Sequence, residues 1–224
     1  IIYLMHDSIQ KLIHIEKLVK SKEANLKKSE VSKIIAVSKT FSLDKIMPLI
    51  NHGHYDYGEN KVQEALDKWT EIKKKNNKIK LHMIGKLQRN KVKKSLQLFD
   101  YIHSLDNIKL ADTIAKEEEK LNRKLKYFIQ VNVGAEEQKS GVSLSNASEF
   151  VYHCVEKLKL DVIGLMALPP QSSDPTKYFK IVSDLNNKLK FKDLSLGMSA
   201  DYIEAIKYNS TFIRVGSTIF GNRS

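Results

Sequence analysis

The stretch KIIAVSKTFSLDKIMPLINH, residues 33–52, contains one complete unit of the fold that the sequence predicts. It begins with an apolar run of strand length, Lys33 to Ser38, and ends with a segment of helical periodicity, Leu43 to His52. The connection, Lys39-Thr-Phe-Ser42, contains no glycine, so it lacks the Gly-rich turn that cradles a pyrophosphate in dinucleotide-binding sheets. We therefore expect a strand, then a lysine at its carboxyl end, then a helix.

The same alternation of strand and helix continues along the whole sequence. Further predicted strands are His54 to Gly58, Lys80 to Gly85, Tyr101 to Leu105, Lys126 to Val133, Val162 to Ala167, Asp193 to Gly197 and Phe212 to Gly216. Further predicted helices are Glu59 to Lys73, Asn90 to Phe99, Ile108 to Leu121, Asn146 to Leu158, Thr176 to Leu189 and Asp201 to Tyr208. Ser42, Asn107 and Ser145 precede three of the helices and are the expected N-caps.

Eight such units predict an α/β fold with parallel strands, and they match a single closed (β/α)8 TIM barrel over residues 1–224. An additional N-terminal helix, Ser8 to Lys22, is expected to cover the seam between the eighth strand and the first. The alternative is an open, doubly wound sheet, against which the glycine-free first turn argues.

Composition limits where the protein acts and what it binds. Cys154 is the only cysteine, so no disulfide can form within the chain, which favours a reducing, cytoplasmic location. The apolar residues Ile1 to Met5 are too few for a membrane span or a leader. The net charge of +12 suggests nucleic-acid binding, but the basic residues are spread over every predicted helix and include few arginines. We expect a monomer that binds neither nucleic acid nor membrane.

In a TIM barrel the functional site lies at the carboxyl ends of the strands. The chemically distinctive residues of this sequence fall there: Lys39, Asn60, His82, Met198, Ser199, Arg214, Gly216 and Ser217. A desolvated lysine amine at such a position loses its charge and becomes a nucleophile toward a carbonyl, so Lys39 is a candidate Schiff-base lysine. The alternative is an ordinary solvated lysine.

Three other features of these strand ends bear on the chemistry. Ser199 before a helix, together with Gly216-Ser217, predicts an anion site, although Gly-Ser pairs also occur in plain turns. Strand periodicity turns Arg214 into the barrel, where it must pair with an interior carboxylate or serve a function. Gln130 and Asn132 share a face of the fifth strand and indicate a polar interior. His82 is either a core histidine or a pocket residue.

Together these segments resemble a known family. The motifs are AVSKT (36–40), YGENKVQEALDK (57–68), HMIGKLQRNK (82–91), QKSGV (138–142), GLMALPP (164–170), SLGMSAD (195–201) and RVGSTIFGNR (214–223). In this order and spacing they are similar to the pyridoxal phosphate homeostasis protein family, also called the YggS or PROSC family, whose fold resembles the amino-terminal barrel of alanine racemase.

The resemblance implies a function and a set of site residues. Lys39 would hold pyridoxal 5′-phosphate as a Schiff base, Ser199, Gly216 and Ser217 would bind its phosphate, and Arg214 would meet its pyridine nitrogen. Asn60, His82 and Met198 would line the pocket. The implied role is intracellular vitamin B6 homeostasis, with pyridoxal-phosphate-dependent apoenzymes as partners.

Two enzymatic alternatives stay open at this stage. Racemases of this fold need a tyrosine from an additional carboxyl-terminal domain, and this sequence ends after the barrel, so we expect cofactor binding without turnover of an amino acid. A racemase-like enzyme dependent on pyridoxal phosphate is the first alternative. The second is a phosphosugar barrel in which Lys39 reacts with the substrate.

Overall fold

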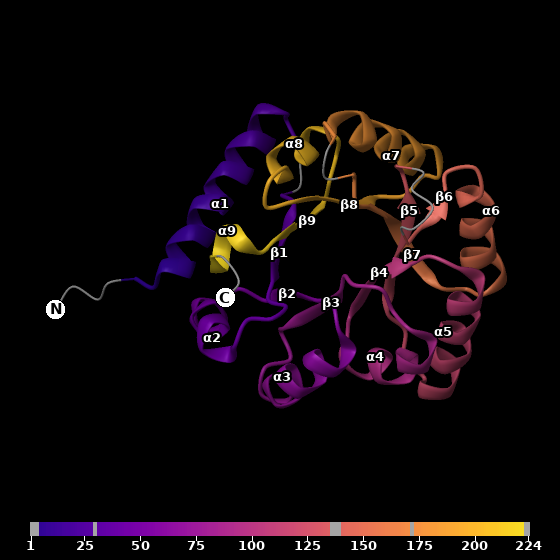
Figure 1. Ribbon diagram of the computed structural model, residues 1–224, viewed down its shortest axis with the longest axis horizontal. Helices are drawn as coiled ribbons and strands as arrows, with labels where there is room; N and C mark the ends of the chain where they lie inside the picture. Colours follow the sequence, from indigo (N-terminus) through magenta and orange to yellow (C-terminus); the bar gives the residue numbers. More distant parts are fainter. Residues whose placement is uncertain (1–4, 29–30, 135–139, 171–172, 222–224) are drawn as a thin grey trace.

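The structure is a computed structural model that describes residues 5–28, 31–134, 140–170 and 173–221 (Figure 1). Two of the motifs extend beyond these ranges, since residues 138–139 and 222–223 lie outside the described residues, as do residues 1–4. All eight site residues predicted from the sequence lie within them.

The strands form a closed parallel barrel. Its members are β1 (Lys33–Val37), β2 (Asp56–Glu59), β3 (Lys80–Met83), β4 (Tyr101–Leu105), β5 (Lys126–Asn132), β7 (Asp161–Ala167), β8 (Asp193–Met198) and β9 (Phe212–Val215). Each pairs in parallel with its neighbour, and the β1–β9 and β4–β5 pairings complete the ring. The predicted TIM barrel is confirmed, and the open-sheet alternative is wrong.

One strand was not predicted. The two-residue β6 (Val142–Ser143) pairs only with β5, outside the ring. A segment this short has no recognisable periodicity, so it could not be predicted from the sequence.

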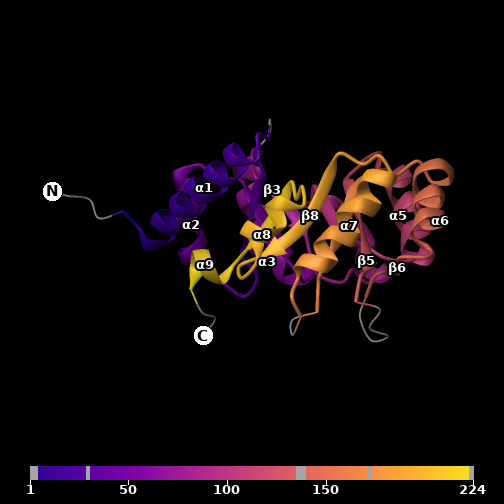
Figure 2. The same cartoon turned by 90° about the horizontal axis from the view of Figure 1, so that it is seen from above.

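Helices surround the ring of strands (Figures 1 and 2). They are α1 (Asp7–Asn25), α2 (Leu43–His52), α3 (Val62–Lys75), α4 (Val92–Leu98), α5 (Ile108–Leu121), α6 (Ala147–Tyr152), α7 (Thr176–Lys188), α8 (Tyr202–Lys207) and α9 (Ser217–Phe220). A 3-10 turn, η1 (Arg89–Lys91), precedes α4, and a π-helical turn, η2 (His153–Lys157), continues α6. Helix α1 packs against α2, α8 and α9 and so covers the seam between β9 and β1, as predicted. No helix in the described ranges is long and apolar enough to cross a bilayer.

The three predicted N-caps differ in the structure. The Asn107 side chain accepts a hydrogen bond from the Leu110 N–H at 2.9 Å, which confirms it as the cap of α5. Ser42 occupies the N-cap position of α2, but its side chain makes no capping hydrogen bond. The Ser145 prediction is wrong: Asn146 is the N-cap residue of α6, and the Ser145 hydroxyl lies 3.0 Å from that of Ser143.

The apolar core has two parts. The larger part lies between the helices and the outer face of the strands, with Trp69, Leu81 and Phe179 among its fully buried members. The smaller part fills the barrel and consists of Ile35, Tyr101, Phe128, Met166 and Phe212. The barrel interior is therefore a packed core, as is usual for this fold, and a ligand can enter only at one of its ends.

Candidate functional site

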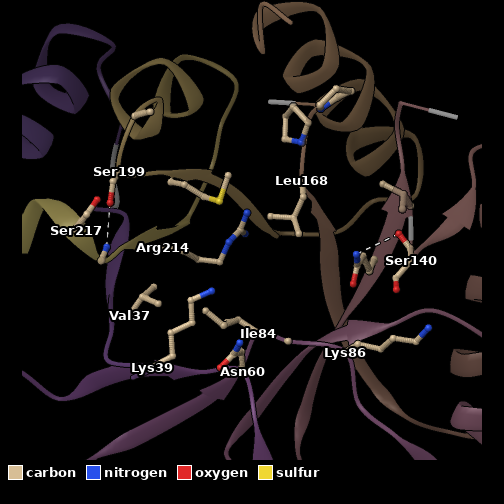
Figure 3. Close-up of a pocket in the computed structure, with 18 of the residues that line it drawn as sticks. Val37, Lys39, Asn60, Ile84, Lys86, Ser140, Leu168, Ser199, Arg214 and Ser217 are labelled. Atoms are coloured by element: carbon tan, nitrogen blue, oxygen red, sulfur yellow. Dashed lines mark hydrogen bonds between the residues drawn. The ribbon is translucent and has the colours of Figure 1, made fainter. Parts of the chain in front are cut away.

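A cavity of about 1090 Å³ lies at the carboxyl ends of the strands (Figure 3). Seven of the eight predicted site residues line it: Lys39, Asn60, Met198, Ser199, Arg214, Gly216 and Ser217. They come from the carboxyl ends of β1, β2, β8 and β9 and from the segments that follow these strands, positions far apart in the sequence. The barrel brings them together because the carboxyl ends of parallel strands meet at one end of the ring.

The backbone on both sides of Lys39 is fixed by hydrogen bonds. The Ser38 N–H donates to the Gly58 carbonyl at 3.0 Å, and its hydroxyl donates to the Glu59 carboxylate at 2.7 Å. The Thr40 N–H donates to Glu64 Oε1 at 2.6 Å, which helps to hold Thr40 at φ 67°, a conformation that costs a non-glycine residue energy. Between these two fixed residues the Lys39 side chain extends into the cavity toward Arg214 (Figure 3).

The carboxylate of Glu59 is the centre of this support. Glu59 is fully buried, and its Oε1 accepts hydrogen bonds from Ser38 Oγ, from Trp69 Nε1 at 2.9 Å and from Lys68 Nζ at 3.0 Å. Lys68 Nζ also donates to Glu64 at 3.1 Å and to the Ser38 carbonyl at 2.9 Å. A buried charge of this kind is tolerated because it is both paired and hydrogen-bonded.

The loops after β8 and β9 meet at the cavity wall. The Gly216 N–H donates to Ser199 Oγ at 3.1 Å, and Gly216 is the N-cap residue of α9, so Ser217 begins that helix. Gly197 has φ 86°, and a Cβ on it would lie 2.7 Å from Ala205 Cβ, so only glycine lets β8 turn this closely onto α8. Backbone N–H groups and hydroxyls brought together in this way suit an anion.

Arg214 is the most buried cation at the cavity, with 3% of its surface exposed. Nη1 donates to the carbonyl of Ser195 at 2.8 Å and to its hydroxyl, and Nη2 donates to the Ala167 carbonyl at 3.0 Å. In the described part of the chain these partners are neutral oxygens rather than the interior carboxylate that the sequence left open. Burial lowers the Arg214 pKa to about 10, against the opposing charge of Asp201, so the guanidinium remains protonated at neutral pH.

The charge of the cavity wall has one sign. Lys39, Lys86 and Arg214 line it, and no Asp or Glu is among its described lining residues. A site with several cations and no carboxylate favours an anionic ligand. Within the described ranges, no group of three or more His, Cys, Asp or Glu residues is placed to hold a metal ion.

Sequence reasoning did not select several residues of the wall. Gln130 and Asn132, which the sequence marked only as a polar interior, lie in it together with Ser140 and Lys86. Gln130 Nε2 donates to the Ser140 carbonyl at 3.2 Å and so joins β5 to the segment before β6. The signal for these two strand residues was their shared face on β5, since a polar pair inside a barrel must have partners or a ligand.

Gly85 allows two loops of the wall to touch. A Cβ on Gly85 would lie 2.3 Å from the carbonyl oxygen of Asn60 and 2.7 Å from its Cα. Only the absence of a side chain lets the segment after β3 pack this closely on Asn60. Gly85 therefore fixes the position of Asn60 at the cavity.

His82 is the predicted site residue that the structure does not bring to the cavity. It is absent from the lining residues, and its Nε2 lies 3.0 Å from Oδ1 of Asp56, the first residue of β2. The ring thus faces the barrel interior toward the amino end of β2, away from the carboxyl ends where the cavity lies. We leave His82 out of the candidate site.

Comparison with known sequences identifies similar proteins. The family model described as the alanine racemase N-terminal domain matches residues 15–224. The pyridoxal phosphate homeostasis protein of Aquifex aeolicus (strain VF5) is 36% identical over 218 residues, covering 93% of this chain and 95% of the relative. The protein of the same name from Escherichia coli (strain K12) is 33% identical over 199 residues, covering 85% of each chain.

Comparison with solved structures also identifies proteins of similar fold. PipY of Synechococcus elongatus PCC7942, solved with PLP bound, has a TM-score of 0.79 at 28% identity, covering 91% of this chain and 100% of PipY. Alanine racemase of Clostridium difficile 630 has a TM-score of 0.74 at 14% identity, covering 96% of this chain and 56% of the racemase. At that identity the racemase supports the fold alone.

Proposed function

The chain belongs to the pyridoxal phosphate homeostasis protein family, and from this membership we propose that it binds pyridoxal 5′-phosphate covalently at Lys39 and acts in intracellular vitamin B6 homeostasis. One observation carries the proposal. A single cavity is lined by the Lys39 side chain, by the Ser199, Gly216 and Ser217 group and by the buried Arg214. These three parts correspond to the aldehyde, the phosphate and the ring nitrogen of that cofactor.

The residues present fit the cofactor in size and charge. The cavity of about 1090 Å³ exceeds what a single small aromatic phosphate needs, and it is lined by three cations. Val37, Ile84 and Leu168 supply apolar wall for the faces of an aromatic ring. The N–H of Gly216 and the hydroxyls of Ser199 and Ser217 are the donors that would hold the phosphate oxygens.

When bound, pyridoxal 5′-phosphate supplies an electrophilic aldehyde carbon and an aromatic ring that withdraws electrons from it. Lys39 would hold the cofactor through its side-chain amine, the nucleophile suited to an aldehyde carbon. Arg214, which keeps its own proton, would donate toward the ring nitrogen, and a ring nitrogen held unprotonated in this way would withdraw electrons only weakly. This arrangement favours reversible storage and release of the cofactor over turnover of an amino acid.

The proposal extends to the domain organisation, the oligomeric state, the location and the partners of the protein. We propose that residues 1–224 form one domain, because the strands of the single barrel extend from Lys33 to Val215, and that this domain acts as a monomer. Cys154 is buried and is the only cysteine, which suits a reducing cytoplasm. Pyridoxal-phosphate-dependent apoenzymes are the proposed recipients, and the scattered basic residues argue against a nucleic-acid partner.

The test is covalent trapping of the cofactor. Purified protein mixed with pyridoxal 5′-phosphate should develop visible absorbance, lose it on borohydride reduction, and carry the reduced adduct on Lys39 in peptide mapping. Lys39→Ala should abolish the adduct. Lys86→Ala, which removes another lysine of the same cavity, should keep it and lower only the affinity. An adduct on a different lysine in the native protein contradicts the proposal.

A second measurement separates binding from amino-acid turnover. Loaded protein is incubated with alanine and other amino acids in deuterated water, and exchange of the α-hydrogen is followed by NMR. We expect exchange no faster than that of free pyridoxal 5′-phosphate at the same concentration. Exchange far above that background favours the racemase-like alternative.

A further inference from the structure

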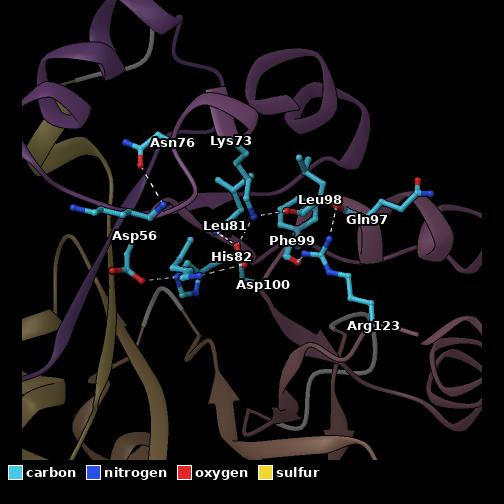
Figure 4. Close-up of polar contacts among 12 residues, drawn as sticks. Asp56, Lys73, Asn76, Leu81, His82, Gln97, Leu98, Phe99, Asp100 and Arg123 are labelled. Carbon is cyan, nitrogen blue, oxygen red and sulfur yellow. Dashed lines mark hydrogen bonds and ion pairs between the residues drawn. The ribbon is translucent and has the colours of Figure 1, made fainter. Parts of the chain in front are cut away.

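A continuous line of hydrogen-bonded side chains crosses the barrel interior and ends at Arg214. Asp56 Oδ1 lies 3.0 Å from His82 Nε2, and His82 Nδ1 lies 3.0 Å from His103 Nε2. His103 Nδ1 lies 2.9 Å from Ser195 Oγ, which accepts a hydrogen bond from Arg214 Nη1. We call these five residues the interior relay. Figure 4 shows its first link, between Asp56 and His82.

The relay is closed to solvent except at its Asp56 end. His82, His103 and Ser195 are fully buried, whereas the Asp56 side chain is 24% exposed. None of these four residues lines the cavity, and only Arg214 belongs to both the relay and the candidate site. The relay therefore connects the amino end of β2 with the cofactor end of the barrel.

Aromatic side chains hold the two imidazole rings in place. His82 stacks on Tyr101 with ring centroids 4.4 Å apart, and His103 stacks on Phe128 at the same separation. Phe212 lies 6.0 Å from both imidazoles. With little freedom to rotate, each ring keeps its two nitrogens directed at its two relay partners.

The donors and acceptors of the relay residues assign a direction to its hydrogen bonds. The Arg214 guanidinium can only donate and an ionised Asp56 can only accept. Ser195 Oγ accepts from Arg214 and can donate its own proton to His103 Nδ1. A neutral imidazole has one donor and one acceptor, so His103 Nε2 donates to His82 Nδ1, and His82 Nε2 donates to Asp56. With both rings neutral, every link is satisfied when each ring carries its proton on Nε2.

The surroundings of the rings agree with neutral imidazoles. Burial lowers the pKa of His82 and lowers that of His103 well below its ordinary value, in the latter case together with the charge of Arg214. The other charged groups that act on His82 are Asp56, Asp100 and Lys33. Although burial alone would raise the Asp56 pKa, the hydrogen bond from His82 and the charge of Lys33 lower it, so Asp56 is ionised at neutral pH.

We propose that Asp56, His82, His103 and Ser195 are positioning residues for Arg214, and that Asp56 acts through the relay as a second, remote counter-charge of its guanidinium in addition to Asp201. The described hydrogen-bond partners of Arg214 are neutral oxygens. Hydrogen bonds aligned in one direction polarise one another, most strongly in a low-dielectric interior. The negative end of the relay thus stabilises the charge and the orientation of the residue that would meet the cofactor ring. The consequence for the cofactor rests on the proposed function, whereas the relay itself does not.

The relay is tested first in the protein without cofactor. In 15N NMR spectra at neutral pH, both His82 and His103 should be neutral and protonated on Nε2. A proton on Nδ1 of either ring, or a charged ring, overturns the assigned direction. This measurement needs no substitution and therefore does not depend on whether a variant folds.

The coupling to Arg214 is tested with Asp56→Asn, which keeps the shape of the side chain and removes its charge. The matched control is Asp112→Asn at the surface, where Asp112 Oδ1 lies 2.9 Å from His153 Nε2. Asp56→Asn should shift the side-chain Nε–H resonance of Arg214, and Asp112→Asn should leave it in place. An Arg214 resonance that does not respond to Asp56→Asn overturns the coupling.

The effect on the cofactor is measured as affinity for pyridoxal 5′-phosphate. Asp56→Asn should weaken binding about threefold to tenfold, a range typical of coupling across a packed interior, and Asp112→Asn should leave it unchanged. In the Ser195→Ala background, where the relay is broken, Asp56→Asn should add almost nothing. Fully additive effects overturn the proposal. If the native protein forms no adduct on Lys39, the proposed function fails, while the NMR result on the relay still stands.

Discussion

The carboxylate of Glu59 accepts a hydrogen bond from the hydroxyl of Ser38 at 2.7 Å, and Ser38 directly precedes Lys39. Glu59→Gln removes the charge that pairs with the buried amine of Lys68. We expect the free energy of unfolding to fall by about 1–3 kcal/mol, because a buried pair loses one partner while Lys68 keeps Glu64. Urea denaturation measures this loss, and the yield of reduced adduct on Lys39 should fall with it.

The control for this prediction is Glu71→Gln, which breaks the exposed pair between Glu71 and Lys74. Exposed ion pairs contribute little to stability, so neither the unfolding midpoint nor the adduct yield should change. Equal effects of the two substitutions would contradict the role of Glu59 in supporting Lys39.

Gly85→Ala tests the close contact between the loops after β2 and β3. The added Cβ would meet the Asn60 backbone at 2.3 Å, so one of the two loops must move. We expect a loss of about 1–3 kcal/mol in the free energy of unfolding, the usual cost of overpacking. Binding of pyridoxal 5′-phosphate should weaken as well, because Asn60 lies in the cavity wall. An alanine variant with native stability and affinity would show that this contact does not fix the wall.

Asn107→Ala and Ser42→Ala form a matched pair of cap substitutions. Asn107 accepts the Leu110 N–H, whereas the Ser42 side chain makes no capping hydrogen bond. Loss of the Asn107 cap should cost about 1 kcal/mol, and Ser42→Ala should cost much less. Thermal or urea unfolding of the two variants under identical conditions decides between them. A larger loss for Ser42→Ala would refute the assignment of the caps.

The buried histidines predict how stability depends on pH. Burial lowers the folded-state pKa of both His82 and His103 from 6.5. Between the lowered value and 6.5 the unfolded chain binds protons that the folded chain does not. The free energy of unfolding should therefore fall as the pH drops below 6.5, by up to about 1.4 kcal/mol per pH unit for each such histidine.

Urea unfolding of the native protein at several pH values between 7.5 and 5.5 measures this slope. His103→Gln removes one of the histidines with a lowered pKa, which also include His54, and should give a flatter profile, whatever its stability at the higher pH. Parallel profiles for the two proteins would mean that His103 is not held neutral in the folded state.

Much of the fold was predictable because its signals are local. An apolar run such as Tyr101–Leu105 and a periodic helix such as Ile108–Leu121 have the same bounds in the structure as in the prediction. The order of these elements along the chain, with a glycine-free turn after the first strand, was enough to choose the barrel over the open sheet. The site followed from that choice, because strand ends that are distant in sequence share one end of a barrel.

The features that were not predicted depend on how deep a side chain lies in the barrel and on how it packs, and a sequence shows neither. The period of two shows that His82 shares a face with Ile84, yet it does not show which layer of the barrel interior the ring reaches. The interior relay joins residues of β2, β3, β4, β8 and β9, and no spacing along the chain connects them. The π-helical turn after Tyr152 likewise interrupts a segment whose periodicity predicted one continuous helix.

Closure of the β-barrel also determines which backbone hydrogen bonds open most readily. Each barrel strand has a parallel neighbour on both sides, whereas β6 is bonded to β5 alone. A closed barrel has no edge strand at which its hydrogen bonds can begin to open. Water therefore reaches the amides of a strand only when the strand separates from its neighbours on both sides together. The slowest hydrogen exchange should thus be distributed around the whole circle, and β6 should exchange early although it lies next to the cavity.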